Sequence, residues 1–356
     1  MGVDRRRFLK LAGAALGTAP LAACGGVEKT PVQGVPQGFY FLDSTAEEVT
    51  LGVDLSGKLA VVTGCTSGIG FETMRVLAKR GAYVVGTSRS MERADAACLR
   101  VRGLTTPVQL DLGDLDSVVQ CAESIRSLNT PIDMLICNAG HRGGGNERQL
   151  VNGIEKHFAV NHLGHFVLVN RLLERLFLAD QGRIIMVSSR AAYRDVGDKG
   201  IDLDDLSMSN QYSDSLAYGQ SKLANALFSL ALSDLLRGTR ITSNALHPGV
   251  INTDIDRNLN PLTRFAFGVL TKLRGKTIEQ GAATTCYVAT NDQLGATSGQ
   301  FFEDFNAVRI ADSQLHNKAL AGELMRVSEE LTADYLVAQE RPDWSEFENG
   351  VRGDRD

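Results

Sequence analysis

Leu59-Ala60-Val61-Val62-Thr63-Gly64-Cys65-Thr66-Ser67-Gly68-Ile69-Gly70 is the stretch that decides the fold of this 356-residue chain. Its first four residues form an apolar run that predicts a buried strand, and the glycines after it predict a turn. Residues 71–80 continue with apolar side chains at helical spacing. A strand, a glycine turn and a helix in this order let a backbone approach a pyrophosphate held at a helix N-terminus.

The same alternation of strand and helix continues along the chain. We expect strands at 82–86, 108–111, 132–137, 183–187, 242–246 and 299–302, with helices at 94–102 and 117–128 among them. Such alternation is typical of a parallel sheet with right-handed crossovers. The predicted fold is therefore α/β, a doubly wound parallel sheet (Rossmann fold), formed by a single domain over residues 55–307.

Tyr218 and Lys222 form a second informative pair, far along the chain from the glycine turn. Residues four apart on a helix share a face, so the ammonium group is expected to stabilise the phenolate. The Tyr218–Lys222 pair is expected to offer a proton, and the glycine turn is expected to hold a nucleotide. Together they indicate a hydride-transfer enzyme.

The overall composition is that of a soluble globular protein, with 43% hydrophobic and 22% charged residues. The net charge is −5. Nucleic-acid binding is excluded because neutralising phosphates requires clustered Lys and Arg, and no basic stripe occurs beyond the N-terminus. The chain shows no internal repeat.

Residues 1–26 have the pattern of a targeting signal. Arginines at 5–7 precede a short apolar stretch, and Leu21-Ala22-Ala23-Cys24-Gly25 is similar to a bacterial lipobox. This predicts a protein exported by the twin-arginine route and anchored in the cell envelope by lipid on Cys24. The alternative is a frayed basic tail on a cytoplasmic enzyme.

The segments around the domain are expected to be accessory. Residues 27–54 mix Gly, Pro, Thr and Glu without periodicity, as in a tether. Residues 308–356 are expected to form a C-terminal helix and a polar tail. The cysteines besides Cys24, at 65, 98, 121, 137 and 286, do not suggest a disulfide framework.

Six motifs in order make the chain resemble the short-chain dehydrogenase/reductase family, and more narrowly its retinol-dehydrogenase-like branch. The resemblance covers residues 55–307. The motifs are Thr63-Gly64-x-x-x-Gly68-x-Gly70, Asn138-Ala139-Gly140, Val160-Asn161-His162-Leu163-Gly164-His165-Phe166, Ser188-Ser189, Tyr218-x-x-x-Lys222, and His247-Pro248-Gly249 with Thr253.

The resemblance implies a nicotinamide cofactor and the residues that bind it. These are Gly64, Ser67, Gly68, Ile69, Gly70, Ser88, Arg89, Asp111, Leu112, Asn138, Ala139, Gly140, Tyr218, Lys222, Pro248, Gly249, Val250 and Thr253. An acidic residue at the end of the second strand would favour NAD, whereas this chain has Ser88 and Arg89 there. A guanidinium binds the 2′-phosphate, so NADP(H) is predicted, and the alternative is a surface arginine. The Asn138-Ala139-Gly140 motif could also be a plain turn.

The proposed catalytic group is Asn161, Ser189, Tyr218 and Lys222. A carbonyl that receives hydride needs a proton donor and a second donor for its oxygen. Tyr218 is the expected acid in reduction and base in oxidation, and the family implies that Lys222 also binds the nicotinamide ribose. Ser188 and Ser189 face opposite sides of their strand, and the resemblance favours Ser189. Asn161 would anchor a water linked to Lys222, or could instead mark a helix kink.

The histidines and the aspartate-rich insertion are expected to have structural roles. A metal site at His162 and His165 is disfavoured because no third ligand stands at ligand spacing. His247 is expected to be a loop histidine with its hydrogen bonds satisfied. The insertion between Ser189 and Tyr218 is expected to be a solvated surface segment rather than a calcium loop.

Residues 254–280 carry the expected information about substrate. Their apolar centre, 262–270, fits a lid over an apolar substrate, a membrane or dimer contact, or ordinary packing. We therefore predict an NADP(H)-dependent oxidoreductase that interconverts a carbonyl and an alcohol on an apolar small molecule, and homo-oligomers are possible. The alternatives are a carbon-carbon double-bond reductase, sugar-nucleotide chemistry, or a non-catalytic nucleotide-binding protein.

Overall fold

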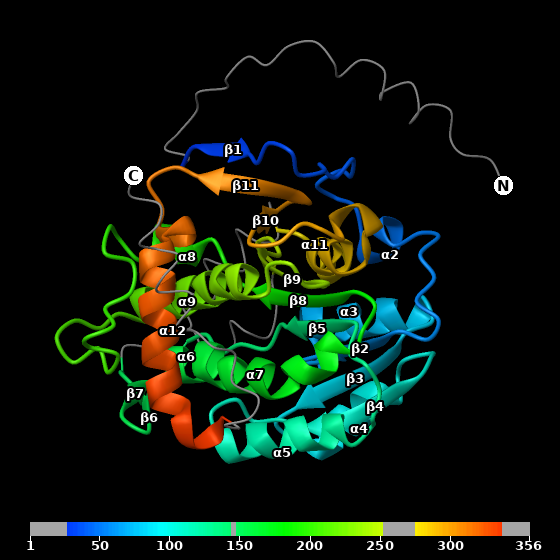
Figure 1. Cartoon of the computed structure of the whole chain (residues 1–356), viewed down its shortest axis with the longest axis horizontal. Coiled ribbons are helices and arrows are strands. Elements are labelled where there is room, and N and C mark those ends of the chain that lie inside the picture. Colours follow the sequence, from blue (N-terminus) through cyan, green and yellow to red (C-terminus); the bar gives the residue numbers. More distant parts are fainter. Residues whose placement is uncertain (1–26, 144–146, 252–274, 337–356) are drawn as a thin grey trace, which may run out of the picture.

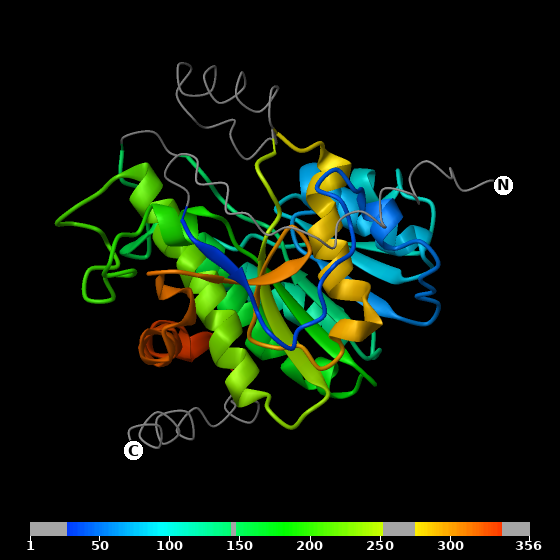
Figure 2. The ribbon, with the colours of Figure 1, turned by 90° about the horizontal axis from the view of Figure 1, so that it is seen from above.

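The computed structural model describes residues 27–143, 147–251 and 275–336. Helices cover both faces of a central nine-stranded sheet (Figures 1 and 2). Its strands in chain order are β1 (Lys29–Pro31), β2 (Leu59–Val62), β3 (Tyr83–Ser88), β4 (Thr105–Gln109), β5 (Met134–Cys137), β8 (Gly182–Val187), β9 (Ile241–His247), β10 (Phe301–Glu303) and β11 (Asn306–Ile310). A small hairpin outside this sheet pairs β6 (Leu150–Val151) with β7 (Ile154–Glu155).

The helices follow the alternation that the sequence predicts, with ends shifted by a few residues. They are α2 (Ala46–Val49), α3 (Gly68–Lys79), α4 (Met91–Cys98), α5 (Leu115–Arg126), α6 (Lys156–Phe158), α7 (Gly164–Phe177), α8 (Ala191–Arg194), α9 (Asp214–Leu235), α11 (Ile278–Thr290) and α12 (Lys318–Thr332). A π-helical turn, η1 (Ala159–Leu163), leads into α7. Short 3₁₀ turns lie at Asp292–Leu294, Gln314–His316 and Ala333–Tyr335.

The sheet order is β1-β11-β10-β9-β8-β5-β2-β3-β4. From β4 across to β10 every neighbouring pair is parallel. The chain winds outward from β2 in one direction through β3 and β4, and then returns to β5 on the other side of β2. The predicted doubly wound α/β fold is confirmed, and its switch point lies between β2 and β5.

Two hydrophobic layers hold the helices against the sheet. Apolar side chains of α5, α7, α9 and α12 pack on one face. Those of α2, α3, α4 and α11 pack on the other. Because both faces are covered, central strands such as β2 and β8 are buried along their whole length, which explains their continuous apolar sequences.

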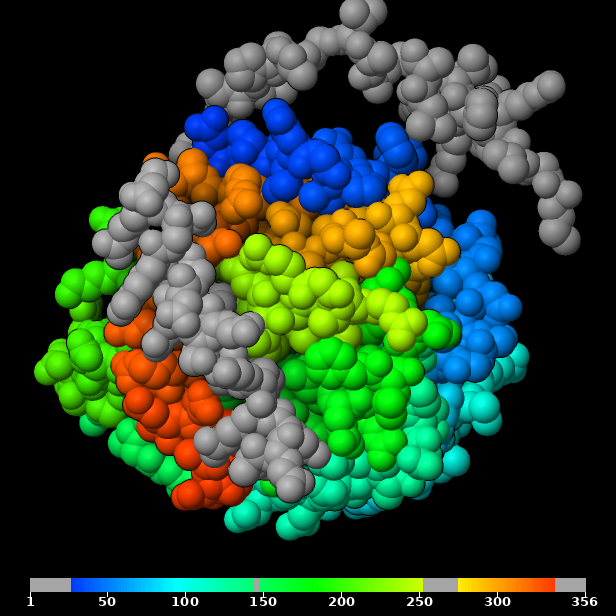
Figure 3. Space-filling view, viewed as in Figure 1, coloured from blue at the N-terminus to red at the C-terminus, as the bar shows by residue number. Residues whose placement is uncertain are grey.

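Residues 27–54, expected to form a tether, contribute a strand and a helix to the fold. β1 pairs antiparallel with β11, with Lys29 opposite Ile310, and is the edge strand of the sheet. The sheet therefore includes residues outside the expected domain limits of 55 and 307. The ring of Tyr40 packs 5.7 Å from the ring of Tyr287, centroid to centroid. In Figure 3 this segment, drawn in blue, lies directly against the orange part of the chain.

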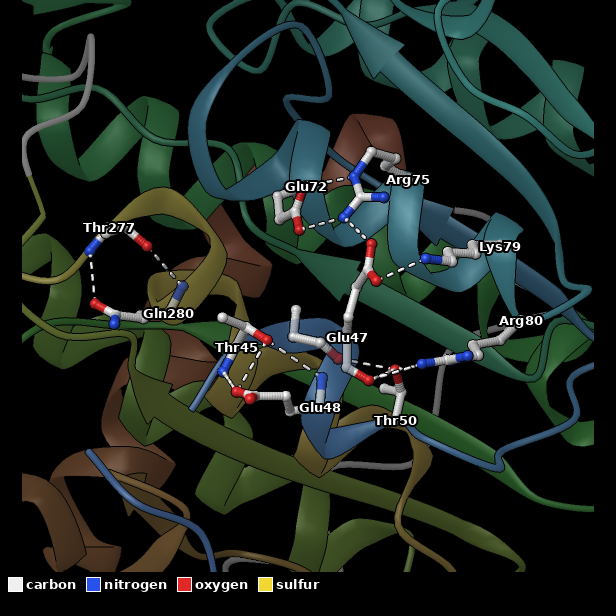
Figure 4. Close-up of polar contacts among 11 residues, drawn as sticks. Thr45, Glu47, Glu48, Thr50, Glu72, Arg75, Lys79, Arg80, Thr277 and Gln280 are labelled. Atoms are coloured by element: carbon white, nitrogen blue, oxygen red, sulfur yellow. Dashed lines mark hydrogen bonds and ion pairs between the residues drawn. The ribbon is translucent and has the colours of Figure 1, made fainter. Parts of the chain in front are cut away.

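The helix α2 fixes the second half of this segment onto α3. Thr45 and Glu48 form a capping box, and Glu47 makes ion pairs with Arg75 and Lys79 of α3 (Figure 4). Arg80 donates to the Glu47 carbonyl oxygen at 2.7 Å. Composition alone suggested a linker because the partners of these residues are far away in sequence.

Candidate active site

A cleft of about 860 Å³ opens at the carboxyl ends of the parallel strands. This is the place where doubly wound folds bind nucleotides. Its lining includes most of the residues that the sequence singled out: Gly64, Ser67, Gly68, Ile69, Gly70, Ser88, Arg89, Asp111, Leu112, Asn138, Ala139, Gly140, Ser189, Tyr218, Lys222, Pro248, Gly249 and Val250. Asn161 lies behind this lining, and Thr253 and residues 254–274 lie outside the described residues.

At the glycine turn, neighbouring parts of the chain approach one another more closely than a residue with a Cβ atom would allow. A Cβ atom on Gly70 would lie 2.2 Å from the carbonyl oxygen of Gly64 and 2.5 Å from Nδ2 of Asn138. Gly64 has a φ of +73°, which favours glycine. Helix α3 begins at Gly68 within the cleft, so its unpaired N–H groups suit the pyrophosphate of a dinucleotide.

The adenosine end of the cleft is marked by two arginines. Ser88 ends β3, and Arg89 follows it with an exposed side chain. Arg93, on the first turn of α4, lines the same part of the cleft and was missed by the sequence analysis. Its spacing of four from Arg89 was the available signal. The strand end therefore presents guanidinium groups and no carboxylate at positions 88 and 89.

Buried hydrogen bonds fix the loop after β5. The hydroxyl of Thr63 accepts from the backbone N–H groups of Asn138 and Ala139, each at 2.9 Å. It is also 3.0 Å from Nε2 of His165, whose Nδ1 is 2.9 Å from the carbonyl oxygen of Asn161. Burial lowers the pKa of His165 to about 4, so this histidine is neutral. Asn138, Ala139 and His165 therefore have a structural role, which is to fix the loop after β5.

Tyr218 and Lys222 lie one turn apart on α9, and both are buried at the cleft. Nζ of Lys222 is 5.8 Å from the centre of the Tyr218 ring and donates to the carbonyl oxygen of Val187 at 3.0 Å. Burial lowers the pKa of Lys222 to about 8. A Cβ on Gly140 would lie 3.2 Å from this Nζ, so the absence of a side chain there makes room for the ammonium group.

The two candidate serines have different partners. The hydroxyl of Ser188 is buried and donates to the carbonyl oxygen of Lys222 at 2.7 Å. The hydroxyl of Ser189 accepts from the backbone N–H of Ala191 at 3.2 Å and keeps its own proton to donate. This geometry favours Ser189 as the hydroxyl available to a substrate oxygen, in agreement with the choice made from the sequence.

Asn161 lies in the π-helical turn η1 and joins three parts of the site. Its Oδ1 accepts from the N–H of His141 at 2.6 Å, and its Nδ2 donates to the carbonyl oxygen of His141 and to Oγ of Ser221. Ser221 in turn donates to the carbonyl oxygen of Tyr218. The irregular helix agrees with the alternative of a kink, and such turns are frequent at functional sites.

His247 is not a loop histidine with satisfied hydrogen bonds, and that expectation was wrong. It is the last residue of β9, it is 5% exposed, and it lines the cleft. Neither ring nitrogen has a hydrogen-bond partner among the described residues. Burial, with the nearby Arg190, lowers its pKa well below the ordinary value. Unpartnered buried nitrogens beside the cleft fit a site that a polar ligand completes.

A buried carboxylate on β10 was also missed. Glu303 of β10 is 3% exposed and makes ion pairs with Arg190, which follows Ser189, and with Lys29 of β1 at 2.7 Å. The hydroxyl of Tyr193 donates to it at 3.2 Å. Lys29 lies 274 residues from Glu303 in the sequence, and Arg190 and Tyr193 lie 113 and 110 residues away, so no local pattern could have revealed this cluster.

Comparisons with known proteins agree with this arrangement. Residues 58–199 match the family model for short chain dehydrogenase. The short-chain dehydrogenase TIC 32 A, chloroplastic, of Brassica napus is 39% identical over 279 residues, which cover 75% of this chain and 86% of that protein. Retinol dehydrogenase 12 of Mus musculus is 37% identical over 290 residues, which cover 79% and 88%.

Solved structures give the same result. The crystal structure of an uncharacterised protein from Mycobacterium paratuberculosis matches with a TM-score of 0.61 at 32% identity, covering 79% of this chain and 95% of that one. A short chain dehydrogenase/reductase family protein matches with a TM-score of 0.56 at 26% identity, covering 70% and 96%.

These relatives correct the predicted location. The two curated proteins named above are eukaryotic, and one is chloroplastic by name, which contradicts a location in a bacterial cell envelope. Residues 1–26, including Cys24, which carried that prediction, lie outside the described residues. None of the helices in the described part of the chain is long and apolar enough to cross a membrane.

Fold, motif order and sequence identity over most of the chain therefore lead to one assignment. Two of the relatives exceed 30% identity over more than two thirds of their own length. The fold is one that binds nicotinamide cofactors, and the cleft has the glycine turn and open helix end that such a group requires. The chain belongs to the short-chain dehydrogenase/reductase family of oxidoreductases.

Proposed function

We propose that this protein is an NADP(H)-dependent oxidoreductase that interconverts a carbonyl and an alcohol on an apolar small molecule. The observation that carries the proposal is the presence of Tyr218, Lys222 and Ser189 in the same cleft as the glycine turn. A bound nicotinamide would supply the hydride or accept it. The protein's residues would hold the substrate oxygen and move the proton.

The proposed roles follow from the hydrogen-bond geometry. Tyr218 gives its phenolic proton to the substrate oxygen in reduction and takes it back in oxidation. Lys222, held by the carbonyl oxygen of Val187, favours the phenolate through its positive charge. Ser189 donates its hydroxyl proton to the same substrate oxygen. Asn161 holds the loop at His141 and, through Ser221, the backbone of Tyr218.

The choice of NADP(H) is supported by Arg89 and Arg93 at the end of β3. Two guanidinium groups favour a 2′-phosphate by charge-assisted hydrogen bonds, and Ser88 adds no repelling charge. The apolar substrate is supported by a relative that is named for retinol, an apolar alcohol. The apolar composition of residues 262–270 also favours an apolar substrate.

The test is a steady-state assay with a panel of apolar aldehydes and both cofactors. We expect kcat/KM to be at least about tenfold higher with NADPH than with NADH. Tyr218→Phe should lower kcat by at least about 100-fold while the Kd for NADPH changes less than about threefold. Tyr83→Phe, which removes a hydroxyl bonded to Thr106 on β4, is the matched control and should be active. A preference for NADH, or full turnover by Tyr218→Phe, would contradict the proposal.

A further inference from the structure

Tyr218 has a charged residue one turn away in each direction along α9. Lys222 lies four residues after it and Asp214 four residues before it. Residues at this spacing share one helix face. The ammonium group of Lys222 favours the phenolate, whereas the carboxylate of Asp214 disfavours it when it is ionised.

Asp214 faces a buried histidine that belongs to α6. The side chain of His157 is 2% exposed, and its Nε2 is 3.7 Å from Oδ1 of Asp214. Its other nitrogen, Nδ1, is 2.8 Å from Oε1 of Glu155. The His157 ring meets the Tyr218 ring edge to face, with centroids 6.1 Å apart. The imidazole is thus placed between two carboxylates and beside the phenol.

The number of protons in this group follows from its geometry. A neutral imidazole has one N–H, so it can donate to only one of the two carboxylates. The other nitrogen would then face a carboxylate oxygen with no hydrogen between them, which is unfavourable. Nε2 of His157 and Oδ1 of Asp214 are both hidden from solvent and have no hydrogen-bond partner within the described part of the chain. One additional proton between these two atoms, with a small closure of the 3.7 Å gap, removes the conflict.

Glu155 remains the fixed carboxylate of the group. Its Oε2 accepts from the backbone N–H groups of His157 at 2.8 Å and Phe158 at 3.2 Å, which fixes its position. Burial raises the pKa of Asp214, and the charges of His157 and Arg142 act against this rise. The gap between Nε2 of His157 and Oδ1 of Asp214 is therefore the place where an additional proton would fit.

In the described part of the chain, three other titratable side chains border the group. The ring of His141 lies 4.9 Å from that of His157, and Cζ of Arg142 lies 5.0 Å from the centre of the Tyr218 ring. Burial, with the charges of Asp214 and Glu155, raises the pKa of Tyr212 to about 12, so this phenol is neutral at working pH. These residues come from the loop after β5 and from the entry to α9.

We propose that Glu155, His157 and Asp214 form a proton-sharing triad that acts on Tyr218 from the side opposite Lys222 and sets the pH at which this tyrosine ionises. His157 and Asp214 are positioning residues that act through Tyr218. The inference rests on the proposed function because it takes Tyr218 as the group that exchanges the proton.

Charge counting gives a signed prediction for each variant. With its shared proton, the triad has a net charge of −1 from two carboxylates and one imidazolium. In Asp214→Asn the amide oxygen can accept from Nε2–H, so the proton stays on the imidazole beside the carboxylate of Glu155, and the net charge of zero favours the phenolate. His157→Gln leaves two carboxylates and a charge of −2, which disfavours it. The double variant returns to −1.

The experiment measures kcat for alcohol oxidation against pH, with NADP⁺ saturating. Relative to the wild type, Asp214→Asn should lower the pH of half-maximal turnover by about 0.5 to 1 unit, and His157→Gln should raise it by a similar amount. The double variant should return to within about 0.3 unit of the wild type. If the side chains only support the fold, kcat falls in both variants with no shift of opposite sign.

The controls separate this inference from the proposed function. Asp116→Asn removes an exposed carboxylate from the first turn of α5 and should leave the midpoint unchanged. Circular dichroism checks folding, and if His157→Gln does not fold, Glu155→Gln replaces it and should shift the midpoint downward, like Asp214→Asn. Unshifted profiles, or shifts of the same sign in Asp214→Asn and His157→Gln, overturn the triad. Full turnover by Tyr218→Phe would instead overturn the proposed function.

Discussion

The two halves of the cleft are built in different ways. The nucleotide half, from β2 to β5, is formed by glycine backbone, hydroxyl groups and helix ends. Its shape requires that the glycines have no Cβ atom. The half that holds the proposed catalytic residues, from β8 to β11 with α9, depends on buried charges, including Lys222 and the Glu303 cluster. The first half should therefore fail when an atom is added, and the second when a charge is removed.

The largest effect is expected from Gly70→Ala. The new Cβ would lie 2.2 Å from the carbonyl oxygen of Gly64, which is backbone and cannot move aside without distorting the turn. We expect the Kd for NADPH, measured by fluorescence titration, to rise at least about 100-fold, a loss of about 3 kcal/mol.

Gly295→Ala is a control with the same chemical change in ordinary helical backbone. Gly295 has a φ of −57°, and its added Cβ would lie 3.2 Å from the carbonyl oxygen of Asp292, away from the cleft. Its NADPH affinity should equal that of the wild type. A Kd for Gly70→Ala within about threefold of the wild-type value would show that the turn is not built by steric exclusion.

The next effect is the loss of stability in Glu303→Gln. Removing the buried carboxylate breaks the ion pairs with Arg190 and Lys29. Because both cations are partly exposed and Arg190 also lies 3.9 Å from Asp304, we expect a loss of about 2 to 3 kcal/mol in urea unfolding. Glu47→Gln removes an ion-paired carboxylate that is 38% exposed, and it should lose less than about 1 kcal/mol. Equal losses in the two variants would contradict the importance of burial.

The contribution of Glu303 to the free energy of unfolding should change with pH in a definite direction. Burial raises the pKa of Glu303, but the hydrogen bond from Lys29 and the charge of Arg190 outweigh it, so the net shift is downward. The native state then binds this proton less readily than the unfolded chain does. The stabilisation is present above the ordinary glutamate pKa near 4.5 and is lost as the pH falls through the lower folded value. Unfolding of Glu303→Gln between pH 5 and 3 should lack this part of the acid dependence.

The smallest effect is a gain of stability in Lys222→Met without nucleotide. The pKa of Lys222 is lowered by burial from 10.5 to about 8, so its charge destabilises the fold at neutral pH, and we expect a gain of about 2 kcal/mol together with loss of turnover. Because the group loses its proton in the folded state first, the wild type regains stability as the pH rises from 8 to 10.5. The difference between the two proteins should shrink over that range. Lys79→Met, at an exposed position on α3, should change stability by less than about 0.5 kcal/mol, and a destabilised Lys222→Met would contradict the account.

The contrast between the halves also explains what the sequence could predict. The glycine turn, Asn138-Ala139-Gly140 and the Tyr218–Lys222 pair are short motifs whose geometry is local, so their placement in one cleft followed from the order of strands. The same reasoning favoured Ser189, which lines the same cleft. Asp214 was visible too, since it repeats the four-residue spacing of Tyr218 and Lys222, but its meaning depends on His157, which comes from another helix.

Other features depend on contacts between distant residues. Residues 27–54 have the composition of a linker, and only the capping box at Thr45 and Glu48 marks α2 locally. Glu303 gives no local signal because Lys29 and Arg190 lie 274 and 113 residues away. The π-helical turn at Asn161 requires the bonds to His141 and Ser221 that hold its side chain.

The pairing of β1 with β11 has a consequence for the order of folding. A growing chain makes Lys29–Pro31 long before Asn306–Ile310, so this edge strand must wait for its partner while the parallel sheet forms from the strands between them. Closing so long a loop has a high entropic cost, which favours pairing late and after the sheet is assembled. In refolding experiments, hydrogen-exchange protection of the β1 amides should therefore develop after that of β2 and β5, and these amides should be the first to open again.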